Sequence, residues 1–168
     1  ADEELDAVPH LLACALECED QIRSLAAQLA GAEALVVIGR GFGFPVALEW
    51  SLKLKEVAAV SAEAFSAADY RHGPIALASS GAPVLVCDCA ASVRPELNEL
   101  EQELRSRGAQ VVRVSDEEAA AVRLALGPEW LAAVPAAVPG QLLAFHLARA
   151  RGLDPDRAHG LRKVTKTF

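Results

Sequence analysis

The chain has 168 residues and contains no methionine, not even at its first position. Aromatic residues make up only 5% of it, and its formal net charge is −7. A nucleic-acid surface needs a basic patch or a platform of aromatic side chains, and the sequence has neither. No apolar run approaches the length of a membrane span, and the first residues lack the pattern of a signal peptide. These absences predict a cytoplasmic protein that binds no nucleic acid and no membrane.

Cysteine is also scarce, with four residues in the whole chain. Cys14 and Cys18 would share one face of a helix, and Cys87 and Cys89 one face of a strand. This spacing matches no common zinc pattern. We therefore expect buried free thiols, no metal and no cofactor.

Hydrophobic residues, by contrast, make up 52% of the chain, which is enough for one domain with a real core. Apolar periodicity and turn residues predict alternating helices and strands. The expected helices are 6–29, 45–59, 95–107, 128–134 and 139–151, with a helical turn at 74–79, and the expected strands are 34–38, 61–65, 84–89, 110–115 and 122–126. This order predicts an α/β fold of three layers around a mostly parallel five-stranded sheet, with a flavodoxin-like topology.

The stretch 39–56, GRGFGFPVALEWSLKLKE, is the centre of this arrangement. It leads from a buried strand through a glycine turn into a helix, at the sheet edge where open α/β proteins bind ligands. Its glycines read G-x-G-x-G and not G-x-G-x-x-G, which disfavours a dinucleotide site. The backbone amides at the start of the helix could still bind an anion.

Three charged residues interrupt the apolar surface of this helix. Glu49, Lys53 and Glu56 follow at i, i+4 and i+7, so they form one row. The row is either an ordinary solvent face with a Glu–Lys pair, or it faces a cleft and performs acid–base chemistry. The spacing alone does not decide between these two interpretations.

Two further segments carry polar residues suited to a ligand. His72 lies in the loop 70–74, YRHGP, and polar loop residues serve ligands more often than packing, although a single surface histidine is ordinary. Basic residues gather near the end of the chain, at 157–166. They are either a solvated terminus or a flap that brings an ammonium group to an anionic substrate.

Four segments together resemble the sugar isomerase (SIS) domain: residues 39–56, 62–74, 141–156 and 160–167. More closely, they resemble the second SIS domain in the isomerase half of glucosamine-6-phosphate synthase and its aminotransferase-like and deglycase-like relatives. One departure is Trp50, which is bulky where relatives often have a small residue. The resemblance implies one SIS domain over residues 1–168, with 152–168 as an active-site tail. It also implies a missing N-terminal SIS domain that binds the sugar phosphate, and the absence of methionine agrees with this.

The resemblance implies a chemistry and a set of roles for these residues. The intact protein would interconvert the aldose and ketose forms of a ketose or amino-sugar 6-phosphate, with or without amination or deamination, whereas this chain alone would be inactive. Glu56 matches the catalytic base, with Lys53 and Glu49 contacting or positioning the substrate. His72 would serve the neighbouring subunit of a homodimer with shared sites, and Lys163 would form a Schiff base. The alternative is a non-catalytic SIS module that senses sugar phosphates for a regulator.

Overall fold

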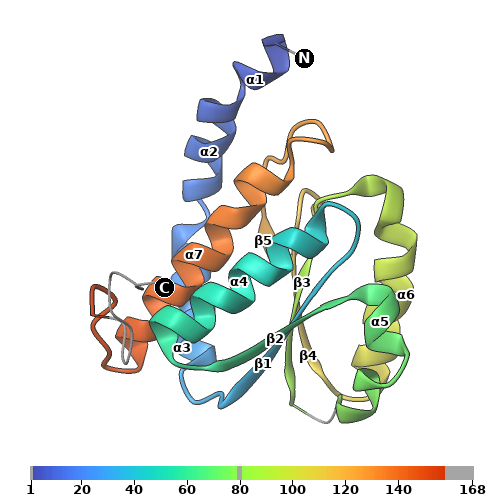
Figure 1. Cartoon of the computed structure of the whole chain (residues 1–168), viewed down its shortest axis with the longest axis vertical. Helices are drawn as coiled ribbons and strands as arrows, with labels where there is room; N and C mark the ends of the chain where they lie inside the picture. The colour runs from blue at the N-terminus through green and yellow to red at the C-terminus, as the bar shows by residue number, and fades with distance from the viewer. Residues whose placement is uncertain (1, 79–80, 158–168) are drawn as a thin grey trace, which may run out of the picture.

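The computed structural model describes residues 2–78 and 81–157 of the chain. Its centre is a sheet of five parallel strands in the order β2-β1-β3-β4-β5 (Figure 1). The strands are β1 (Ala34–Gly39), β2 (Ser61–Ser66), β3 (Pro83–Cys87), β4 (Gln110–Ser115) and β5 (Val122–Arg123). The strand order reverses between β1 and β3, as in flavodoxin-like proteins, so the predicted fold class is confirmed.

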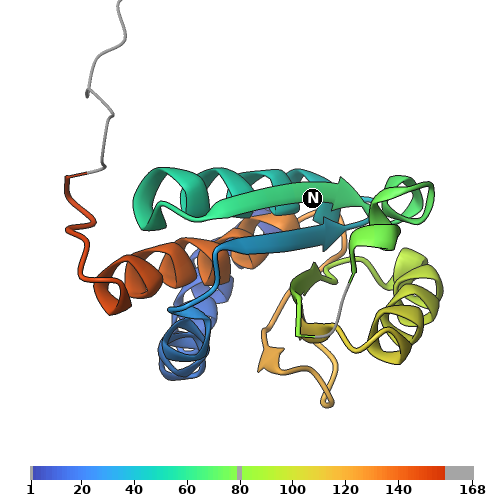
Figure 2. The same cartoon turned by 90° about the horizontal axis from the view of Figure 1, so that it is seen from below.

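Helices cover both faces of the sheet (Figure 2). One face carries α3 (Glu19–Leu29), α4 (Gly43–Ala58) and α7 (Ala133–Ala150), and the other carries α5 (Ala67–Arg71), the 3₁₀ turn η1 (Pro74–Leu77) and α6 (Arg94–Ser106). The side chains of β1 alternate between the two cores: Leu35 and Val37 join the first, and Ile38 joins the second. This alternation explains why an almost purely apolar strand is needed at the centre of the sheet. No described helix is long and apolar enough to cross a membrane.

The first predicted helix, 6–29, was wrong as a single element. The chain forms α1 (Asp2–Leu5), α2 (Val8–Leu16) and α3, with a turn at residues 17–18. At that turn the amide of Glu17 donates to the carbonyl of Cys14, and that of Cys18 to Ala15, so bonds to the third preceding residue replace the α-helical ones. The turn lets α2 and α3 pack separately against α7. In Figure 1, α1 and α2 extend beyond the sheet.

The helix predicted at 128–134 was wrong, whereas the one predicted at 139–151 forms most of a longer helix, α7, which passes through Pro135 and Pro139. Pro135 lies in the first turn, where a backbone amide would have no partner within the helix. Pro139 does cost a hydrogen bond, but it and its neighbours are buried against the other helices. The predicted strand 122–126 shortens to β5, because only Val122 and Arg123 pair with β4.

Trp50 of α4 packs directly on the backbone of α7. It is 1% exposed, and its indole Nε1 donates to the carbonyl of Ala136 at 2.9 Å. A Cβ placed on Gly140 would lie only 2.0 Å from Cδ1 of Trp50. A residue without a side chain is therefore required opposite this tryptophan, which explains how the fold accommodates so bulky a residue at position 50.

Candidate active site

Glu49, Lys53 and Glu56 lie in one half-buried row along α4. The opposite side of α4 is buried, with Trp50 and Leu54 in the core. Lys53 Nζ lies 2.7 Å from Glu56 Oε2, and the two side chains are 33% and 34% exposed. The helix thus brings together three of the five residues that the sequence indicated.

The charges of this row act on one another. The pKa of Lys53 is raised above its ordinary value, first by the hydrogen bond that its ammonium donates to Glu56, with a partly opposing effect of burial and further contributions from the charges of Glu56 and Glu49. Lys53 is therefore a cation at neutral pH, which suits an electrostatic role and not a nucleophilic one.

The row does not lie in a closed cleft. Leu48 and Leu52, which directly precede Glu49 and Lys53 in the chain, are 49% and 43% exposed. The outer surface of α4 therefore presents an apolar strip beside the charged row. Within the described residues this side of α4 faces outward, so a cleft over the charged row would have to be completed by another domain or subunit.

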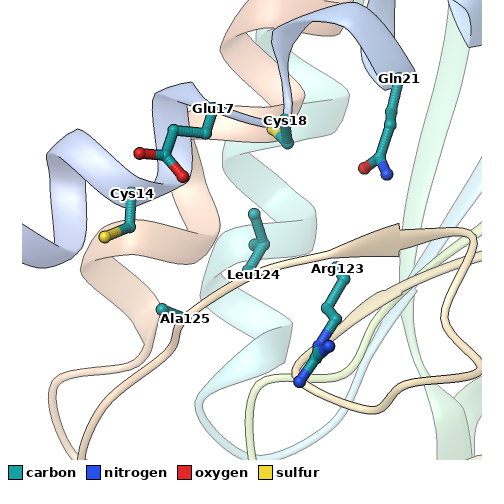
Figure 3. A pocket seen from close by; sticks show the side chains of 7 residues that line it. All are labelled: Cys14, Glu17, Cys18, Gln21, Arg123, Leu124 and Ala125. Carbon is teal, nitrogen blue, oxygen red and sulfur yellow. The ribbon is translucent and has the colours of Figure 1, made fainter.

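A cavity of about 450 Å³ lies elsewhere, between α2–α3 and the end of the sheet at β5 (Figure 3). It is lined by Cys14, Glu17, Cys18, Gln21, Arg123, Leu124 and Ala125. Burial raises the pKa of the Cys18 thiol to about 11, so this sulfur stays protonated and unreactive near neutral pH. The cavity holds none of the residues indicated by the sequence.

His72 is exposed and lies at the opposite end of the sheet from Glu56. Glu56 is in the last turn of α4, shortly before β2 begins, whereas His72 follows β2 and α5. The two are separated by the six residues of β2, roughly 20 Å at about 3.3 Å per residue. Figure 2 shows the end of α4 and α5 at opposite ends of β2. A single chain therefore does not bring His72 to Glu56.

The crevice between the ends of β1 and β3 is filled by contacts of the chain with itself. The amides of Gly43 and Phe44 donate to the carbonyls of Arg40 and Gly41 at 2.9 and 3.1 Å. The Arg40 guanidinium pairs with Glu96 of α6, with Nε 2.8 Å from Oε2. These two amides at the start of α4 are therefore paired within the chain, so the anion site considered from the sequence would have to use other amides of this turn.

The hydrogen-bond donors of Ser92, in the loop after β3, are also paired within the chain. Ser92, in the 3₁₀ turn η2 (Ala91–Val93), donates to the Glu129 carboxylate from its amide at 3.2 Å and from its hydroxyl at 2.5 Å. These two hydrogen bonds lower the pKa of Glu129. In α/β folds with an open sheet, hydrogen-bond donors at this point commonly bind a ligand. Here the two donors of Ser92 are bound by the carboxylate of Glu129 from the same chain.

One residue that the sequence reasoning missed holds the end of α4 in place. Arg151, which directly follows α7, donates from Nη1 to the carbonyl of Ala58 and from Nη2 to that of Ala32, both at 3.2 Å. It thereby joins the end of α4, the turn before β1 and the end of α7. An arginine at a helix end is a weak signal, since its partners lie far away in the sequence.

Lys163 lies outside the described residues. Among residues 2–78 and 81–157, no group of three or more histidine, cysteine or acidic side chains is arranged to hold a metal ion. All four cysteines are free; three are buried as expected, and Cys14 is half-buried.

Comparison with known proteins identifies the family. A family model described as the SIS domain matches residues 28–148. The glutamine–fructose-6-phosphate aminotransferase (isomerizing) of Thermococcus kodakarensis is 38% identical over 168 residues, and that of Bradyrhizobium diazoefficiens is 37% identical over 169. These alignments cover 96% and 95% of the chain but only 28% of either relative.

Solved structures agree with these relatives. The C-terminal domain of glucosamine-fructose-6-phosphate aminotransferase from Francisella tularensis superposes with a TM-score of 0.86 at 28% identity. Glucosamine-6-phosphate deaminase from Thermotoga maritima superposes with a TM-score of 0.77 at 30% identity. Each superposition covers 92% of this chain, but only 46% of the Francisella chain and 47% of the Thermotoga chain. The chain belongs to the SIS domain family.

Proposed function

We propose that this domain supplies the acid–base half of an active site that isomerises a ketose or amino-sugar 6-phosphate, within a longer protein that has a preceding SIS domain. The observation that carries the proposal is the ion pair of Lys53 and Glu56, flanked by Glu49, on the outer side of α4. The named relatives act on fructose or glucosamine 6-phosphate, and this chain spans about a quarter of the curated ones.

The chemistry requires a base that moves a proton between neighbouring carbons. In the open-chain sugar, Glu56 would take a proton from C1 of the ketose, leaving an enediolate whose oxygen on C2 takes up a proton. Glu56 would then return its proton to C2 while the hydroxyl on C1 gives up its own, which yields the aldose. Lys53 would donate to a sugar oxygen, and Glu49 would hold Lys53 in position. Because Lys53 is a stable cation, an amine that forms a Schiff base with the sugar must come from elsewhere. Lys163 in the tail is our candidate.

His72 completes the proposed site only from a neighbouring subunit. Its distance from Glu56 within one chain supports a homodimer with shared sites. There its imidazole would help to open the sugar ring, since histidine can pass a proton near neutral pH.

The replacement Glu56→Gln tests the base in the longer protein. It keeps the shape of the side chain and its contact with Lys53 but removes the proton acceptor, so turnover of fructose 6-phosphate should fall at least about 100-fold. Glu63→Gln is the matched control, because Glu63 is an exposed carboxylate on β2 with no part in the row. Unchanged turnover in Glu56→Gln would remove Glu56 from the mechanism.

Subunit complementation tests the shared site. Mixing a His72→Ala chain with a Glu56→Gln chain should restore part of the activity, because one of the two sites in a heterodimer then has both residues intact. Heterodimers that form without any recovery would contradict sharing between subunits.

The alternative is a sensor that binds the sugar phosphate without turnover. Calorimetry with glucosamine 6-phosphate separates the two: tight binding to a longer protein that shows no isomerisation would favour the sensor.

A further inference from the structure

The last turn of α4, which carries Glu56, ends in a backbone conformation that alanine disfavours. Ala59 directly follows the helix with φ 51° and ψ 42°, in the left-handed region. Among the described residues it is the only one other than glycine with a positive φ. This conformation costs free energy in a residue that has a Cβ, and it persists only where the surroundings hold it. Contacts from outside the helix are therefore needed to hold this turn.

Arg151 supplies such a contact. The carbonyl of Ala58 is one of the last four of α4, which have no partner within the helix. Ala58 is 0% exposed, so water does not bond to this carbonyl in place of a protein donor. It accepts a hydrogen bond from Nη1 of Arg151, while Nη2 of the same guanidinium donates to the carbonyl of Ala32. One planar cation thus fixes the end of α4 against the turn before β1, at the negative end of the helix dipole.

Arg151 also lies where the tail begins. It is the C-cap residue of α7. The next residue, Gly152, has a φ of 73° and turns the chain out of the helix. The residues that follow lead toward Lys163, our candidate amine. The same side chain therefore joins the helix that carries the proposed base to the start of the segment that carries the proposed amine.

We propose that Arg151 is a positioning residue for the isomerisation: it holds the last turn of α4 so that Glu56 keeps the geometry that proton transfer requires. This inference rests on the proposed role of Glu56. Arg151 acts on the reaction only through the backbone of α4, and a displacement of about 1 Å in a catalytic group can cost on the order of 100-fold in rate. Its loss should therefore lower kcat and leave substrate binding nearly unchanged.

Steady-state kinetics of the longer protein with fructose 6-phosphate test this role. Arg151→Met should lower kcat by about tenfold or more, with KM within about twofold of wild type. Arg149→Met is the matched control: it removes the same charge from the same helix, but Arg149 is exposed and packs over the ring of Phe145, 5.7 Å from its centroid. Its kcat should stay within about twofold of wild type.

A second control separates positioning from a general loss of stability. Val111, on β4, is 6% exposed and belongs to the core on the other face of the sheet. Val111→Ala should lower the melting temperature about as much as Arg151→Met does, yet keep kcat within about twofold of wild type. An equal fall of kcat in both variants would overturn the positioning role.

Hydrogen exchange followed by mass spectrometry tests the contact without any turnover. In Arg151→Met, peptides covering residues 53–60 should exchange about tenfold faster or more, because the end of α4 opens locally, whereas peptides covering 44–52 should not change. Arg149→Met should change neither. Unchanged exchange at 53–60, or a kcat of Arg151→Met equal to that of Arg149→Met, would overturn the inference. Full turnover in Glu56→Gln would instead overturn the proposed function, and the exchange result does not depend on it.

Discussion

Replacing Gly140 by alanine is the sharpest test of how α4 and α7 are joined. The new Cβ would lie 2.0 Å from Cδ1, 2.1 Å from Cγ and 2.5 Å from Nε1 of Trp50. No pair of non-bonded heavy atoms tolerates such distances, so the indole must move by more than an ångström. Trp50 is 1% exposed, so this movement takes place inside the packed core.

Three effects set the size of the loss. Forcing an extra carbon into a packed core costs about 1–3 kcal/mol. Displacing the indole breaks its hydrogen bond to the Ala136 carbonyl, which contributes about 1 kcal/mol. Alanine has a higher helix propensity than glycine, which stabilises the folded state by about 1 kcal/mol. The free energy of unfolding should therefore fall by about 2 kcal/mol, and the melting temperature by roughly 5 °C for a domain of this size.

Urea unfolding followed by circular dichroism measures this loss. Gly31→Ala is the control, because no atom lies within 4 Å of a Cβ at Gly31. In the double variant Trp50→Ala, Gly140→Ala the two effects should not add, since the clash disappears with the indole. A Gly140→Ala chain within about 0.5 kcal/mol of wild type, the usual range of a surface change, would refute this account of the contact.

Two further predictions concern buried charge. Arg151→Met keeps most of the side-chain volume but removes both hydrogen bonds to Ala58 and Ala32, so the free energy of unfolding should fall by about 2 kcal/mol in the same urea assay. An unchanged value would show that Arg151 does not hold the end of α4. Asp88 at the end of β3 is fully buried, and this burial raises its pKa above 3.8 in spite of the hydrogen bonds from Ser115 and Arg94. The folded state then holds the proton of Asp88 to higher pH than the unfolded state. The stability of wild type relative to Asp88→Asn should therefore grow as the pH falls from neutral toward 3.8, and a constant difference would contradict the raised pKa.

Local sequence patterns predicted correctly those features that depend on residues close together in the chain. The strand β1 and the charged row on α4 follow from runs and spacings that span a few residues, and both were predicted. The sheet order followed from the alternation of elements along the chain.

The errors came from contacts between distant parts of the chain. Pro139 alone predicts a helix break, and only the packing of α7 against Trp50, some ninety positions earlier, explains why the helix continues. Arg151 was missed for the same reason, since its partners are Ala32 and Ala58. The resemblance indicated both His72 and Glu56 but gave no distance between them. Their separation within one chain supports the proposal that His72 serves a second subunit.

The contact of Ser92 with Glu129 means that any anion binding at Ser92 has to compete with the Glu129 carboxylate. A carboxylate tethered within the same folded chain has an effective concentration on the order of millimolar or higher at its binding partner. Free phosphate or a phosphorylated sugar that approaches this loop must displace it from both the amide and the hydroxyl of Ser92. A ligand with the same intrinsic affinity for Ser92 as the Glu129 carboxylate would therefore need at least about a millimolar concentration to displace it.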